Sequence, residues 1–307
     1  MTKAVRGAGV LAGLAVWVLV GPPSVQAPPP GGAAPLAPGW ARLLASGTLT
    51  AVNQPPQTVT LAISGAVRLE EFEGGSVWRQ KALGGTHVVY LLPATLLVDS
   101  GLRPIPAAAV RPGDTTVLWA AVRPDAAILA LTLQVTPSRP QMVGSAPAWL
   151  TSAGAVGVVL ERSGSMLQIL TPAGTLRSVV MTGVTAISSG GQAPPGGAVS
   201  PYDILRVEGP VNSDGSIAAT RIDVEFTTAS AAQVSGPVEW SVNDLGGLVV
   251  GGTMIATSAD TYIILRAALA RFADLSPRRP VTVYGTAVRA GDTPIGLRAR
   301  VILARVY

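Results

Sequence analysis

Short apolar runs separated by turn residues recur along most of this 307-residue chain. The runs are about five to eight residues long, rich in Val, Ile, Leu and Thr, which is typical of β-strands. The pair Asp214-Gly215 between two such runs predicts a tight hairpin. Helical signals are few: Ala107 to Val110 and Ala267 to Leu275 each predict one short helical turn. The pattern therefore predicts an all-β protein.

Sequence landmarks recur in three successive units. Each unit opens with a small residue, a glycine and an apolar-rich strand, first at Ser46-Gly47. In the first two units an aspartate precedes a late strand, and Asp114 and Asp203 are 89 residues apart. Ile128 and Ile217, in the last strands of the same units, are also 89 residues apart. Landmarks that keep the same spacing indicate an internal repeat.

Stretches rich in proline, glycine and small residues divide the chain between these units. They are typical of linkers, because they cannot form a ladder or a helix. We expect a leader at 1–27, a Pro/Gly-rich tether at 28–41, a β unit at 42–136 with an insertion near 68–87, a linker at 137–149, a second unit at 150–226, a linker at 227–233 and a third unit at 234–307.

Each unit has enough strands for a small barrel, in which closure removes exposed sheet edges. The motifs at Arg111 to Val117 and Asp214 to Ile222 resemble those of an uncharacterised family of bacterial exported domains with small OB-like barrels. The third unit departs from them, with Arg278-Arg279-Pro280-Val281 in place of the Gly-Asp pair. The resemblance implies three tandem OB-like β-barrel units with short linkers, and it supplies no activity and no site residues.

The N-terminal segment has the three parts of a signal peptide. Lys3 and Arg6 precede an apolar stretch from Ala8 to Val20, and Val25-Gln26-Ala27 has small residues where a signal peptidase cuts. Pro28 hinders cleavage at that point, so an uncleaved N-terminal anchor is the alternative. In both cases we expect the rest of the chain outside the cytoplasm: extracellular, on the cell surface or in the periplasm.

The composition limits which reactions and metal sites the chain can support. The chain is 48% hydrophobic and 13% charged, and it has no cysteine, which excludes disulfides, thiolate nucleophiles and Cys-ligated metals. The formal net charge is +5, and removing Lys3 and Arg6 with the leader lowers it to +3. The positive charge is scattered arginine, with no dense basic block despite the pI of 10.1.

The first unit is about 20 residues longer than the others, and the extra segment from Arg68 to His87 is rich in charge. A charged, glycine-bracketed insertion on a rigid scaffold is a candidate recognition loop. The alternative is a solvated hairpin with its tryptophan packed on the barrel. The candidate binding residues are Arg68, Glu70, Glu71, Glu73, Trp78, Arg79, Lys81 and His87.

No catalytic signature stands out. His87 is the one histidine. It is therefore the single candidate base for a Ser-His-Asp triad, and a zinc site would need carboxylates for its other ligands. Calcium ligation by Glu70, Glu71 and Glu73 lacks the usual loop pattern, so we expect no metal and no cofactor. A pair of carboxylates in a cleft would instead indicate a carbohydrate hydrolase.

These observations also limit the possible partners of the chain. Arg298, Arg300 and Arg305 on the last strand have no aromatic ladder beside them, and export removes intracellular nucleic acid, so we expect no nucleic-acid partner. The membrane is contacted only through an uncleaved leader. We predict an exported non-enzymatic β-repeat protein with a binding or structural role toward an unknown envelope or extracellular protein or glycan. The alternatives are an envelope carbohydrate hydrolase that uses carboxylates and a surface protein that self-assembles through sheet edges.

Overall fold

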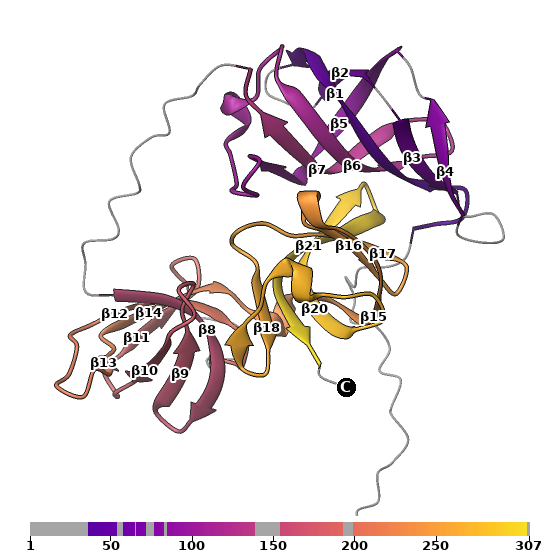
Figure 1. The fold of residues 1–307 in the computed structure, drawn as a ribbon. Helices are drawn as coiled ribbons and strands as arrows, with labels where there is room; N and C mark the ends of the chain where they lie inside the picture. The colour runs from indigo at the N-terminus through magenta and orange to yellow at the C-terminus, as the bar shows by residue number, and fades with distance from the viewer. Residues whose placement is uncertain are drawn as a thin grey trace, which may run out of the picture.

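The computed structural model describes residues 36–53, 58–64, 66–71, 77–82, 85–138, 154–192 and 199–305. These residues form three sheets of seven strands, one after another along the chain (Figure 1). The sheets confirm the predicted all-β fold with three tandem OB-like barrels. The predicted leader at 1–27 and most of the linker at 137–149 lie outside the described residues.

Barrel 1 closes on itself in the order β1-β2-β5-β7-β6, with β1 paired to both β2 and β6. The β5–β7 pairing is parallel and the other four pairings in the ring are antiparallel, which is the arrangement of an OB barrel. Its strands are β1 (Ala41–Asn53), β2 (Thr58–Ile63), β3 (Ala66–Glu71), β4 (Val77–Ala82), β5 (Gly85–Val98), β6 (Thr115–Val122) and β7 (Ile128–Thr136).

Barrel 2 repeats this order, with its last strand split into two segments. β13 pairs parallel to β10 and β14 pairs to β12, so the two segments together complete the ring. Its strands are β8 (Gly154–Ser163), β9 (Met166–Leu170), β10 (Leu176–Val180), β11 (Ala186–Ser188), β12 (Ile204–Glu208), β13 (Ile217–Ala218) and β14 (Arg221–Phe226).

Barrel 3 closes in the order β15-β16-β17-β21-β20, again with one parallel pairing, between β17 and β21. Its strands are β15 (Ala232–Val242), β16 (Gly247–Val250), β17 (Thr253–Ala256), β18 (Tyr262–Leu265), β19 (Ala268–Leu269), β20 (Pro280–Ala290) and β21 (Thr293–Ala304). Each barrel encloses its own aliphatic core, as the alternation of buried and exposed positions along the strands requires.

The two predicted helical turns have different outcomes. Ala107–Ala109 forms a 3-10 turn before β6, close to the prediction. In the second segment only Phe272–Asp274 is helical, and Ala268–Leu269 pairs with β18 as a strand.

Barrel 3 contacts both other barrels, and it lies between them in Figure 1. One apolar cluster joins Trp119 and Leu131 of barrel 1 to Val249 and Met254 of barrel 3. A second cluster joins barrel 2 to barrel 3 and includes Tyr262, which is 7% exposed. Burial is the main cause that raises the pKa of Tyr262, to about 12.

Candidate ligand-binding face of barrel 1

OB barrels bind extended ligands on the outer face of their second and third strands and on the loop between the fourth and fifth. In barrel 1 these are β2, β5 and the loop between β6 and β7. Val89 of β5 points into the core, so its neighbours Val88 and Tyr90 point outward. They are 49% and 44% exposed, among the large apolar side chains left open to solvent in the described chain.

An open cleft of about 500 Å³ lies beside these two side chains. It lies where β5 meets the loop between β6 and β7 and the start of β7. Its lining residues are Thr86, His87, Val88, Tyr90, Arg123, Asp125, Ala126, Ala127, Ile128 and Leu129.

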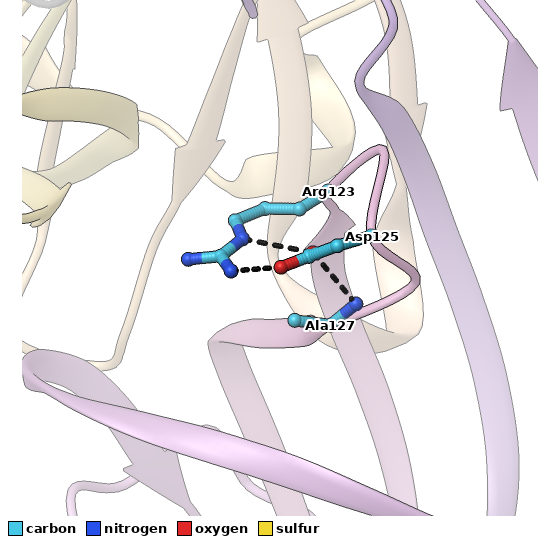
Figure 2. A network of polar contacts seen from close by, with 3 residues as sticks. All are labelled: Arg123, Asp125 and Ala127. Atoms are coloured by element: carbon cyan, nitrogen blue, oxygen red, sulfur yellow. Dashed lines mark hydrogen bonds and ion pairs between the residues drawn. The ribbon is translucent and has the colours of Figure 1, made fainter.

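The loop beside the cleft is held by a polar network (Figure 2). The Arg123 guanidinium donates from Nε to Oδ1 of Asp125 at 3.0 Å and pairs through Nη2 with Oδ2. Oδ1 of Asp125 also accepts from the backbone N–H of Ala127 at 3.2 Å. The bond from Arg123 is the main cause that lowers the pKa of Asp125 to about 2, so Asp125 is ionised at neutral pH.

Hydroxyl groups continue the face across β2. Thr58 lies opposite Tyr90 and Thr60 opposite Val88 in the antiparallel ladder, and both threonines are half-buried. Asn53 at the end of β1 donates from Nδ2 to the Thr58 hydroxyl at 2.7 Å. The face thus combines the Tyr90 ring, the hydroxyls of Thr58 and Thr60 and one arginine–aspartate pair.

The corresponding face of barrel 3 is already covered. Val249 of β16 and Met254 of β17 have no exposed surface, because they pack against barrel 1. In barrel 2 the outward side chains of β9 and β10 include Met166 and Leu176, which are exposed. They carry neither an aromatic ring nor a charge. Barrel 1 therefore offers the most varied open face of the three.

The predicted recognition segment forms a hairpin of β3 and β4 that pairs with the first half of β1. The side chains of Arg68, Glu70, Glu71, Glu73, Trp78, Arg79 and Lys81 lie outside what the structure describes, so their binding role stays a prediction.

His87, the eighth candidate, lies on β5 rather than in the hairpin. It lines the cleft, but its Nε2 is buried and has no hydrogen-bond partner. The sequence prediction missed Tyr90, Arg123 and Asp125. The available signal was the Arg-Pro-Asp turn between two strands, which is the position of an OB ligand loop.

The described residues also bear on glycoside hydrolysis, metal binding and membrane-spanning helices. Asp125 is the single carboxylate among the residues that line the cleft, so the cleft does not provide the pair that glycoside hydrolysis needs. Within the described ranges, no group of three His, Asp or Glu side chains is placed to hold a metal ion. Those ranges also contain no helix of the length and apolarity needed to cross a membrane.

No family model and no curated protein sequence matches this chain. The resemblance to exported bacterial domains at Arg111 to Val117 and Asp214 to Ile222 therefore stays a prediction, whereas the OB-like fold is shown.

Solved structures of similar fold include a protein described as Drosophila Unr CSD456, at 11% identity and a TM-score of 0.18, covering 83% of this chain and 94% of that one. The single-stranded DNA binding protein of Thermus aquaticus, in a deletion mutant, is 13% identical, with a TM-score of 0.17, and the coverage is 61% and 95%. A Streptococcus pneumoniae multidomain protein with nucleic acid binding domains is 10% identical, with a TM-score of 0.15 and coverage of 86% and 73%.

The last two descriptions name nucleic acid, which the sequence analysis excluded as a partner. That prediction is withdrawn, because it did not consider the open face of barrel 1. The prediction rested on export and on the last strand of barrel 3, and that strand is not the face on which an OB barrel binds its ligand. Arg298 and Arg300 are half-buried on β21, and burial lowers the pKa of Arg298. An exposed aromatic ring and an exposed arginine, Tyr90 and Arg123, lie together at the cleft of barrel 1 instead.

Proposed function

We propose that this chain is a non-enzymatic binding protein for single-stranded nucleic acid, held by barrel 1 on β2, β5 and the loop between β6 and β7. The observation that carries the proposal is one cleft lined by both the exposed Tyr90 ring and Arg123. Bases stack on such aromatic rings without regard to sequence, and each stack contributes about 1–3 kcal/mol.

The kind of cation in the chain supports the same ligand. All but two of its 22 cationic residues are arginine. Arginine pairs with phosphate and stacks on aromatic and base rings better than lysine does. The signal-peptide pattern of residues 1–27 supports export, and outside the cytoplasm the ligand would be nucleic acid released from cells.

Fluorescence anisotropy of a labelled 12-nucleotide oligothymidylate titrated with the full chain tests the proposal. Tyr90→Ala is expected to weaken binding about 10-fold or more, because it removes the stacking ring. Arg123→Ala is also expected to weaken it, through loss of a cationic donor. Arg177→Ala, on an exposed position of barrel 2, is the matched control and should leave affinity unchanged.

Two outcomes contradict the proposal. One is the absence of saturable binding even at low salt. The other is binding that Tyr90→Ala leaves intact. Because OB faces also bind oligosaccharides, a neutral hexasaccharide is titrated in parallel. Binding of the sugar in place of the oligonucleotide, lost in Tyr90→Ala, would overturn the nucleic-acid assignment while keeping the site.

A further inference from the structure

The cation in the cleft is already engaged. Arg123 binds both carboxylate oxygens of Asp125 through Nε and Nη2. Asp125 is held in place in turn by the Ala127 N–H. Arg123 and Asp125 are the two charged side chains among the residues that line the cleft, so their charges cancel.

This pairing decides which part of a nucleic-acid strand the cleft favours. A phosphate that bound Nε and Nη2 in this two-pronged geometry would have to displace Asp125. The negative charge of Asp125 also opposes an approaching phosphate. A base carries no net charge, so it can stack on Tyr90 without this repulsion. Acceptor atoms of the base can also receive hydrogen bonds from the guanidinium N–H groups that Asp125 does not occupy.

We infer that barrel 1 binds a strand through its bases rather than its phosphates, and that Asp125 is the residue that sets this preference. The inference rests on the proposed function and adds the part of the ligand that is recognised. Asp125 acts through Arg123 as a positioning residue, because it keeps the guanidinium from serving as a phosphate clamp.

The test compares oligothymidylate with an abasic strand of the same length and backbone, using the full chain. Wild type is expected to bind the abasic strand at least about 10-fold more weakly, because the stacking contacts are lost. Asp125→Asn removes the competing charge and frees Arg123. It is expected to tighten binding of the abasic strand several-fold and to reduce the preference for bases.

The salt dependence gives a second readout. One additional phosphate contact steepens the slope of log K against log salt by about 0.7 for a single strand. Asp125→Asn should show this steeper slope. Asp214→Asn, which removes the same charge from the corresponding loop of barrel 2, should keep the wild-type slope.

The outcomes separate the two proposals. No binding of either strand by wild type defeats the proposed function itself. Equal wild-type affinity for the abasic and the base-carrying strand leaves nucleic-acid binding standing and overturns the recognition of bases. An Asp125→Asn variant that matches Asp214→Asn in slope and in base preference overturns the role of Asp125.

Discussion

Two aspartates that mark the sequence repeat perform the same task in barrels 1 and 2. Asp114 accepts from the N–H groups of Arg111 and Ser138, both at 3.0 Å. Asp203 accepts from the N–H groups of Ser200 at 2.8 Å and Thr228 at 2.9 Å. Both aspartates are 3% or less exposed. Each carboxylate links the turn before the fourth strand of the five-stranded ring, β6 or β12, to a residue just after the fifth, β7 or β14.

Barrel 3 makes the same link with the opposite chemistry. Arg279 precedes β20 and donates from Nη1 to the carbonyl of Arg305, just after β21, at 3.2 Å. The departure of the third unit from the Gly-Asp motif therefore replaces an acceptor side chain with a donor side chain, and the same two points of the barrel stay joined.

Replacing Asp203 with alanine leaves two partly buried N–H groups without this acceptor, so we expect barrel 2 to lose about 2–4 kcal/mol of stability. Hydrogen exchange of the β12 and β14 amides in the full chain measures the change. Asp223→Ala is the control, because the half-buried Asp223 accepts from the Ser188 hydroxyl at 3.1 Å and should cost less. Equal protection in both variants would contradict the role given to Asp203.

At the scale of elements, the sequence predicts the barrels well because turns and alternation are local signals. The hairpin at Asp214-Gly215 and the spacing of the aspartates both correspond to structure. The sequence predicts one short helical turn within Ala267 to Leu275, and Phe272–Asp274 forms one. The prediction missed the strand at Ala268–Leu269, since a short apolar run has no period that separates a turn from a strand. Ala268–Leu269 pairs with the neighbouring β18 across a two-residue turn at Arg266 and Ala267. Both turn residues have positive φ, a conformation that neither residue type favours, so the sequence carries no hairpin signal there.

One glycine fixes how closely two strands of barrel 3 approach. A Cβ on Gly285 of β20 would lie 2.0 Å from the carbonyl oxygen of Arg298 on β21, so any side chain there forces the strands apart. We expect Gly285→Ala to destabilise barrel 3 by about 3 kcal/mol, measured by urea unfolding followed through β20 and β21 amide signals. Gly183→Ala, where a Cβ would meet open space, should be nearly neutral. A stable Gly285→Ala barrel would contradict this role of Gly285.

At the scale of the whole molecule, the contact between barrels could not be predicted from the sequence. Trp119 and Trp240 carry no pattern that marks them, yet their ring centroids lie 5.3 Å apart across the contact between barrels 1 and 3. The binding prediction pointed to charge in the insertion because charge is visible in a sequence. The open face around Tyr90 became visible only once the covered faces were known.

The covered face of barrel 3 gives that barrel a structural role, and Trp119 is its test. Trp119 has no exposed surface, and Gln134 beside it on the same barrel donates to the carbonyl of Asp244 at 2.9 Å. We expect Trp119→Ala to cost about 3–5 kcal/mol and to separate the unfolding of barrels 1 and 3. Calorimetry of the full chain detects the separation, with the exposed Val184→Ala as control.

Oligonucleotide binding then distinguishes two roles for the contact between the barrels. The cleft at Tyr90 and Arg123 is built from barrel 1 alone, so Trp119→Ala should still bind the strand at temperatures where barrel 1 remains folded. Loss of binding in a folded barrel 1 would mean that barrel 3 contributes to the site. An unchanged single unfolding transition would mean that Trp119 does not couple the barrels, and that barrel 3 does not stabilise barrel 1 through this contact.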